Sequence, residues 1–347
     1  MERKMPEICN LCTRNCGVGR FCGKGEKLKV ARAALHFWEE PCISGTAGSG
    51  AVFFSGCNLK CIFCQNEKIR DGLVGKEITE ERLSDIFLKL QDKGANNINL
   101  VTAGHFLPKV IGALEDAKNR GLEIPIVYNT SSYEKVEAIR ELDGLVDVYL
   151  PDMKYVSSRL SGDYSKAADY FEVATRAIEE MVRQTGELEF YIKKNASLDQ
   201  QLGLWESEDL MDAATYNECA DELMDEGKEV LMKKGTIVRH LLLPGCAEDS
   251  KAVIRYLYDT YGDGIFISIM NQYTPMPQVA GHPSLARKVT DAEYNEVLDF
   301  ALDLGVENAF MQEGDVAEES FIPEFDCEGV SRLSDLNGHS CLPCRLI

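Results

Sequence analysis

Short apolar runs alternate with amphipathic segments of helical period from residue 51 to residue 311. Short apolar runs are typical of buried strands, and apolar residues that recur every three or four positions are typical of helices. The expected strands are 51–55, 98–102, 125–129, 146–150, 236–243 and 265–270, with 306–311 as a last run. This α/β alternation of six strand–helix units predicts a parallel sheet with helical crossovers. Periodicity alone leaves open a doubly wound layer and an incomplete barrel.

Capping residues place two of the helices. Thr79 is expected to cap a helix that stops at Gly94, and Thr290 with Glu293 forms a capping box before a helix that reaches Leu304. Further helices are expected after residue 108, near 134–142, over about 166–184 and from about 248.

One stretch, 187–229, breaks this rhythm, because it holds thirteen acidic residues against three lysines and lacks a clear strand. We interpret it as an insertion before the fifth strand that is partly helical around 209–224. Charge runs are usually solvated faces, and the alternative is a docking surface for a protein partner.

The net charge of −20 argues against a general nucleic-acid binder, which needs basic residues to neutralise phosphates. No long apolar run follows the first residues, so we expect neither a signal peptide nor a membrane span, and a cytoplasmic location. In such a compartment the clustering of thirteen cysteines favours metal binding or redox chemistry over disulfides.

The most informative cluster comes directly after the first expected strand, where Cys57, Cys61 and Cys64 are spaced C-x3-C-x2-C. Active sites of α/β folds lie at the carboxyl ends of strands. Iron–sulfur clusters with complete protein ligation use four cysteines, so three leave one iron open to a substrate. Gly56 allows a tight turn here, and Phe63 can shield a cluster from solvent. The alternatives are a zinc site and three cysteines that lie together by chance.

Residues 51–66 resemble the radical S-adenosylmethionine (SAM) superfamily signature, C-x3-C-x-aromatic-C. Gly56-Cys57 and Cys64-Gln65-Asn66 are most similar to the pyruvate formate-lyase activating enzyme group. Residues 9–66 as a block resemble a branch related to that activase, through the segments Cys9-Asn10-Leu11-Cys12-Thr13-Arg14-Asn15-Cys16-Gly17-Val18 and Ala34-Leu35-His36-Phe37-Trp38-Glu39-Glu40-Pro41-Cys42-Ile43-Ser44-Gly45. The resemblance covers most of the chain but not 187–229 or the extreme C-terminus.

The resemblance implies a partial (β/α)6 TIM-type barrel over 49–312, preceded by a Cys-rich N-terminal extension over 1–48 and followed by a tail over 313–347. It also implies that the three cysteines hold a [4Fe–4S] cluster at the open top of the barrel. There SAM would be split into methionine and a 5′-deoxyadenosyl radical that abstracts a substrate hydrogen. Such an enzyme needs a one-electron donor such as flavodoxin or ferredoxin.

The resemblance further implies a SAM pocket at the strand ends. Gly104 lies where many relatives have Gly-Gly-Glu, but no acid follows it in this sequence. Asn129 ends the third strand. Asp152-Met153-Lys154 is similar to the Asp-x-Lys motif of the activases, and Lys154 would neutralise the methionine carboxylate. Arg239 suits a carboxylate through its planar fork, and strand alternation places it on the opposite face from His240.

Four more cysteines, Cys9, Cys12, Cys16 and Cys22, lie within fourteen glycine-rich residues. Four thiolates suit either tetrahedral zinc or a second, fully ligated cluster, and the spacing does not decide between them.

Near the C-terminus, Cys341 and Cys344 form a C-x2-C pair that could complete a site with Cys327 or Cys42 or lie in a mobile tail.

Three functions are therefore open at this point. The first is a radical SAM oxidoreductase that activates a glycyl radical enzyme. The second keeps the radical chemistry with a small-molecule substrate. The third is an iron–sulfur or zinc electron carrier or scaffold without SAM chemistry. The strand-end charges favour an enzyme, because a carrier needs no carboxylate-binding residues.

Overall fold

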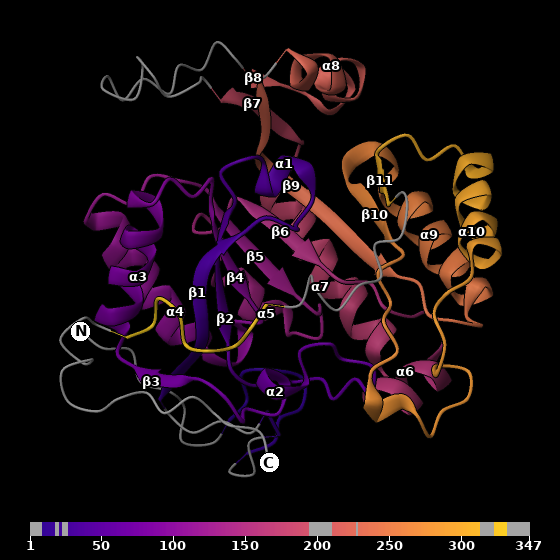
Figure 1. Ribbon diagram of the computed structural model, residues 1–347, viewed down its shortest axis with the longest axis horizontal. Helices are drawn as coiled ribbons and strands as arrows, with labels where there is room; N and C mark the ends of the chain where they lie inside the picture. Colours follow the sequence, from indigo (N-terminus) through magenta and orange to yellow (C-terminus); the bar gives the residue numbers. More distant parts are fainter. Residues whose placement is uncertain are drawn as a thin grey trace.

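An open, curved sheet runs through the molecule (Figure 1). The computed structural model describes residues 9–17, 21–22, 27–193, 210–226, 228–312 and 323–331. The strands follow one another across the sheet as β11 (Ala309–Met311), β10 (Phe266–Met270), β9 (Glu229–Leu241), β6 (Val148–Pro151), β5 (Ile126–Thr130), β4 (Ile98–Val101), β2 (Ser49–Phe54), β1 (Leu28–His36) and β3 (Lys76–Ile78).

From β2 to β11 every neighbouring pair is parallel, whereas β1 is antiparallel to both β2 and β3. Along this parallel part the spatial order equals the chain order, so the sheet winds in one direction as a barrel does. A doubly wound sheet would reverse direction at a switch point. The outermost strands, β11 and β3, are not paired with each other in the described part of the chain. The partial barrel is therefore confirmed.

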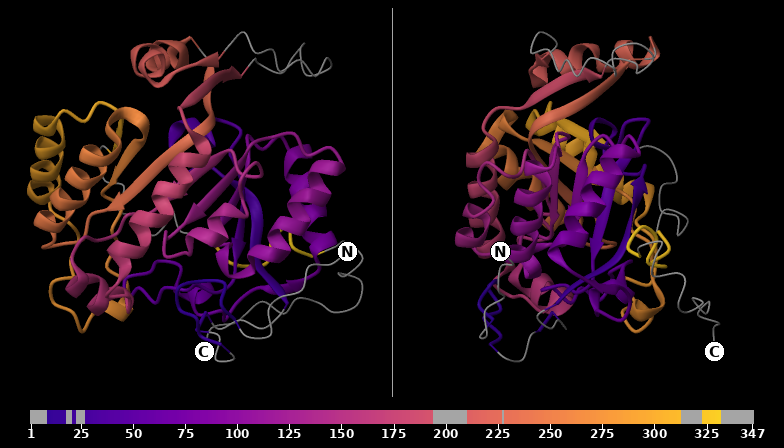
Figure 2. Two further views of the ribbon diagram at one scale, coloured as in Figure 1. Left: turned by 180° about the vertical axis from the view of Figure 1, so that it is seen from behind. Right: turned by 90° about the vertical axis from the view of Figure 1, so that its left-hand side faces the viewer.

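Helices cover the convex face of the sheet, as the front and back views show (Figures 1 and 2). They are α3 (Glu80–Asp92), α4 (Leu107–Asn119), α5 (Val136–Arg140), α6 (Ser158–Ser165), α7 (Tyr170–Thr185), α9 (Ala247–Tyr261) and α10 (Asp291–Leu304). Both predicted caps are present, on α3 and α10, and the capping box of α10 is complete. No helix of the described residues is long and apolar enough to cross a membrane.

The single helix expected over 166–184 is wrong in its first turn. Lys166 takes a left-handed conformation, with φ 56°, and ends α6, so α7 begins only at Tyr170. Period alone cannot reveal such a break, because both helices bury apolar residues against the same part of the sheet.

Two large apolar layers lie between the sheet and these helices, one under α3, α4 and α5 and one under α6, α7, α9 and α10. A third cluster fills the inside of the barrel at the amino ends of its strands, where α1 (Pro41–Ser44) inserts Cys42 and Ile43. The interior is therefore closed at that end and the candidate site lies at the other.

The described part of the acidic insertion projects beyond the amino ends of the strands (Figure 1). It contains β7 (Glu189–Lys193), β8 (Leu210–Met211) and α8 (Ala213–Asp225). The helix expected around 209–224 is confirmed, but the expectation that no strand is present is wrong, because β7 pairs antiparallel with the first half of β9. The strand β7 has only three apolar residues between its charged ends, which is too few for a clear periodic signal.

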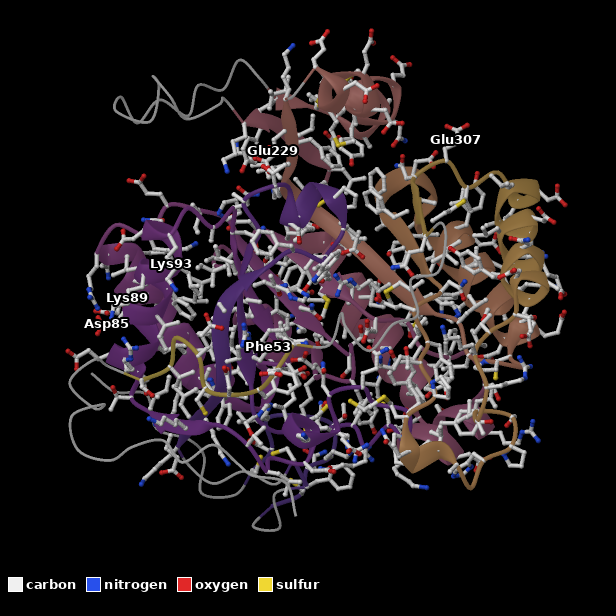
Figure 3. All side chains as sticks on the ribbon, viewed as in Figure 1. Phe53, Asp85, Lys89, Lys93, Glu229 and Glu307 are labelled. Atoms are coloured by element: carbon white, nitrogen blue, oxygen red, sulfur yellow. The ribbon has the colours of Figure 1, made fainter. Side chains whose placement is uncertain are left out.

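The insertion is tied to the barrel through Glu229, which Figure 3 labels where the two meet. Its carboxylate accepts hydrogen bonds from the Thr46 backbone and the Asn96 side chain, and it lies 3.4 Å from the Lys193 ammonium.

Beyond its pairing with β3, the outer edge of β1 is covered by the segment around residues 327 and 328. Cys327 and Ala33 donate backbone hydrogen bonds to Ala31 and Glu328 across this edge, at 3.0 and 2.9 Å. Covering the edge protects it from pairing with another chain. Residues 28–36, which we placed in the N-terminal extension, thus belong to the same sheet, and the three predicted domain boundaries stay predictions.

Candidate active site

The three cysteines lie on the loop that leaves the carboxyl end of β2. Gly56 takes φ 109°, a left-handed conformation that favours glycine, and its amide donates to the Ile69 carbonyl at 2.6 Å. Farther along, the Cys64 amide donates to the Cys61 carbonyl at 3.2 Å, so the loop turns back on itself. The tight turn expected at Gly56 is present, and it points the chain toward the barrel mouth.

The thiols of the triad lie close enough to influence one another. Burial, followed by the neighbouring Cys61, raises the pKa of both Cys57 and Cys64 to about 12. The Leu59 amide donates to the Cys57 sulfur at 3.4 Å, and the Ser165 hydroxyl donates to the Cys61 sulfur at 3.0 Å. Thiols of this kind become thiolates when a metal cation displaces their protons.

As placed, no three His, Cys, Asp or Glu side chains of the described residues surround one point closely enough to hold a single metal ion. A [4Fe–4S] cluster differs in this respect, because each of its three cysteines binds a different iron. A loop that brings three cysteines together around a shared space fits that donor set.

Aromatic side chains enclose the loop. Phe63 is only 6% exposed and packs between the rings of Tyr155 and Tyr273, with centroids 6.5 and 6.3 Å away. The segment after β10 forms the facing wall, where the Gln278 side chain donates to the Cys64 carbonyl at 3.0 Å. Phe63 is therefore buried beside the triad, and its predicted role in shielding a cluster from solvent stays a prediction.

Asp152 and Lys154 follow β6 and lie beside the triad. The Lys154 ammonium contacts the Asp152 carboxylate at 2.6 Å and influences the pKa of Cys57 and Cys64. Burial alone would lower the pKa of Lys154, but the charges of Asp152 and then Cys61 hold it above its usual value. A partly buried ammonium that remains charged is thus available next to the three cysteines, where it can bind a carboxylate.

Arg239 has carboxylate partners within the protein, and its predicted role toward the SAM carboxylate stays a prediction. It lies inside the barrel on β9 and is paired with two carboxylates, those of Glu39 and Glu40. Its Nε donates to Glu40 at 2.9 Å, and its Nη2 donates to both acids. All three side chains are at most 10% exposed.

Asn99 and Asn129 extend this polar group inside the barrel by donating to Glu39, at 2.7 and 3.5 Å. Sequence analysis missed Glu39 and Glu40. The signal available was the pair of adjacent acids before Pro41, at the end of an apolar stretch.

Gly104 opens a short 3₁₀ turn, η1 (Gly104–Phe106), after β4. A Cβ at this position would overlap the buried carboxylate of Glu134, which also accepts a hydrogen bond from the Tyr128 hydroxyl at 2.8 Å. Burial raises the pKa of Glu134. No acid follows Gly104 in the sequence, but the carboxylate of Glu134, from the next loop, lies beside it. That carboxylate is held by the hydroxyls of Tyr128 and Thr130.

Backbone conformation marks the same end of the sheet. Thr102 after β4 and Ser132 after β5 both take φ 61°, which is rare for residues other than glycine. Strained residues of this kind concentrate at functional sites. His105 is buried, and its Nε2 lies 3.0 Å from the Ser55 carbonyl, so it contacts the start of the triad loop.

The remaining cysteines lie in separate places, with Cys219 on α8 and Cys246 directly before α9. Cys9, Cys12, Cys16 and Cys22 lie near one another, beside the triad loop. Cys42 is buried in α1 at the amino ends of the strands, and Cys327 lies on the edge of β1. Cys341 and Cys344 lie outside the described residues.

Residues 51–187 match the family model described as the Radical SAM superfamily. This part of the chain is a radical SAM domain. It begins on β2, includes the whole cysteine loop and Lys154, and ends just after α7.

A relative from Methanocaldococcus jannaschii, described as an uncharacterised protein, is 25% identical over 304 residues, which cover 84% of this chain and 74% of that protein. Among solved structures, Streptococcus suis SuiB bound to S-adenosylmethionine is 13% identical, with a TM-score of 0.42, covering 75% of this chain and 49% of that one. The chain thus spans about half the length of that structure. A domain of pyruvate-formate lyase-activating enzyme from Bacteroides vulgatus is 12% identical, with a TM-score of 0.33. The match covers 60% of this chain and 92% of that domain.

Proposed function

We propose that this protein cleaves SAM reductively and uses the 5′-deoxyadenosyl radical to abstract a hydrogen atom from a substrate. The observation that carries the proposal is the set of three close cysteines at the end of β2, with the charged, partly buried Lys154 beside them. The radical SAM domain supports this chemistry.

Each part of the site has a role in that reaction. Cys57, Cys61 and Cys64 would hold three irons of a [4Fe–4S] cluster, which supplies the electron that splits SAM. Lys154 would bind the methionine carboxylate by a charge-assisted hydrogen bond, and Asp152 keeps that ammonium charged and oriented. Phe63, Tyr155 and Tyr273 keep water from the site, because they pack as a buried aromatic group around the loop.

The overall change is balanced by an external electron. One electron from a donor of the flavodoxin or ferredoxin class, together with SAM, gives methionine and the 5′-deoxyadenosyl radical. That radical takes a hydrogen atom from the substrate, which leaves 5′-deoxyadenosine and a substrate radical.

The test is anaerobic reconstitution with iron and sulfide, followed by reduction and quantification of 5′-deoxyadenosine and methionine. Wild-type protein should form both, and Cys57→Ala, Cys61→Ala and Cys64→Ala should each abolish them. Cys219→Ala is the matched control, because Cys219 lies on α8 at the opposite end of the barrel. Full cleavage by any of the triad variants would refute the assignment, and a carrier or scaffold would bind iron without cleaving SAM.

For the hydrogen donor we propose a glycyl radical enzyme as partner. The similarity of Asp152-Met153-Lys154 to the activase motif supports this choice over a small molecule. Electron paramagnetic resonance of the reduced enzyme with SAM and a candidate partner should give a protein glycyl radical that disappears on substitution of the partner's glycine. Substrate loss from a metabolite pool with no protein radical would instead favour a small molecule.

A further inference from the structure

The segment that carries the four N-terminal cysteines folds as a small hairpin. Cys9 and Gly17 exchange two backbone hydrogen bonds, at 3.2 and 3.1 Å. At the tip, the Asn15 amide donates to the Cys12 carbonyl at 3.1 Å, and Asn15 takes φ 41°. The hairpin thus places Cys9 and Cys16 at its open end and Cys12 in its turn.

Three of these four cysteines are buried, although the segment has little apolar content. Cys9, Cys12 and Cys22 are 8%, 8% and 7% exposed. Burial, and then the neighbouring thiols of Cys9, Cys16 and Cys22, raise the pKa of Cys12 to about 11, so the four thiols lie near one another. As placed, no three of them surround one point closely enough for a single ion, so their side chains would have to close around a bound metal. The Phe21 amide donates to the Cys16 sulfur at 3.3 Å, as the Leu59 amide does to Cys57 in the triad.

Arg14 connects the hairpin to the catalytic loop. Its Nε donates to the carbonyl of Asn58, between the first and second triad cysteines, at 2.9 Å. A terminal nitrogen donates to the Ser165 carbonyl at 3.4 Å, and the Ser165 hydroxyl in turn bonds the Cys61 sulfur. The guanidinium stacks on Phe21 of the hairpin segment and on Tyr133 of the barrel, 4.3 and 4.8 Å from the ring centroids.

We propose that Cys9, Cys12, Cys16 and Cys22 form a second metal site for a thiophilic metal, and that this metal braces the catalytic loop through Arg14. Four thiolates around one metal centre can order a short polar segment, because metal binding supplies folding free energy. Binding releases up to four protons. For Zn²⁺ the resulting site carries two negative charges, close to Arg14 and to Lys60, whose ammonium lies 5.9 Å from the Phe21 ring.

The site is distinct from the triad in its ligand count. Four protein thiolates leave no coordination position for SAM, so the hairpin metal cannot carry out the cleavage. Only its bracing role rests on the proposed function. The existence of the site does not, and the experiments separate the two.

The first experiment measures metal in a Cys57→Ala, Cys61→Ala, Cys64→Ala triple variant, produced with zinc and iron both supplied. Retained zinc of about one per chain indicates a mononuclear centre, and retained iron of about four per chain indicates a second cluster. A matched variant that also carries Cys12→Ser and Cys16→Ser should lose this metal. In the triple variant, mass spectrometry after alkylation should find the hairpin thiols protected until a chelator is added, with Cys219 as the reactive reference. Absence of both metals, with all four thiols alkylated before chelation, would overturn the proposal.

The second experiment measures hydrogen exchange over residues 56–65 in the same triple variant, which needs neither SAM nor catalysis. Removal of the hairpin metal should accelerate exchange there by roughly tenfold or more, as expected when hydrogen bonds from a charged donor are lost. Arg14→Ala should accelerate exchange to the same extent while metal content is unchanged, and chelation should then add little. Lys27→Ala, in an exposed ion pair with Glu77, is the control for loss of a surface charge. Unchanged exchange after chelation would refute the bracing role.

Discussion

Replacing Arg239 by methionine removes the cation from a buried group of three charges. The Glu39, Glu40 and Arg239 side chains are 8%, 6% and 10% exposed, so neither carboxylate can recover its hydration without opening the barrel. Breaking a buried ion pair by removing one partner costs about 3–5 kcal/mol of unfolding free energy. Because typical domains have a total of about 5–15 kcal/mol, this loss is large.

The penalty should depend on pH in a definite direction. Burial alone would raise the pKa of Glu40, but the charge and hydrogen bonds of Arg239 hold it below its ordinary value of 4.5. In the wild type, Glu40 therefore stabilises the fold above pH 4.5, and this contribution is lost as the pH falls through the lowered pKa. Without Arg239 the effect of burial remains, so the variant should be weakest near neutral pH and recover part of the difference in acid.

The assay is urea unfolding followed by circular dichroism between pH 5 and pH 8. A Glu39→Gln, Glu40→Gln, Arg239→Met triple variant is the control, because neutral side chains of similar volume often replace a buried ionic group without loss. It should regain most of the stability. Arg239→Met protein within about 1 kcal/mol of wild type would refute the reasoning. If the Arg239→Met protein has normal stability but no longer binds SAM, Arg239 belongs to the SAM pocket.

Two further predictions concern single contacts. Lys154→Met should weaken SAM binding by about 1.5–3 kcal/mol, on the order of ten- to a hundredfold, because a charge-assisted hydrogen bond to the carboxylate is lost. If calorimetry finds an unchanged Kd, Lys154 pairs only with Asp152 and does not bind SAM. Thr290→Ala should lower the unfolding free energy by about 1 kcal/mol, because the Thr290 side chain accepts a hydrogen bond from the Glu293 amide at the start of α10. Equal urea midpoints for variant and wild type would contradict this.

Much of the barrel could be predicted from the sequence because its signals are local. An apolar run of five residues, a threonine before a helix and a glycine after it each act over one or two turns. The position of the three cysteines at the end of β2 follows in the same way, since a ligand loop placed after a parallel strand lies at the barrel mouth. The break at Lys166 and the pairing of β7 escaped, because neither changes the local apolar pattern.

The sequence by itself determined the strand–helix alternation, the caps of α3 and α10 and the spacing of the triad. Only the tertiary structure decided which charges meet. Arg239 and Glu40 are 199 residues apart, and Arg14 and Asn58 are 44 apart, yet each pair is in direct contact. A buried charge takes its partner from whatever the closing sheet brings within a few ångströms, because in a poorly hydrated interior attraction between close charges outweighs any local preference. Spacing can therefore nominate a charged residue for a site, while the assembled barrel decides what it binds.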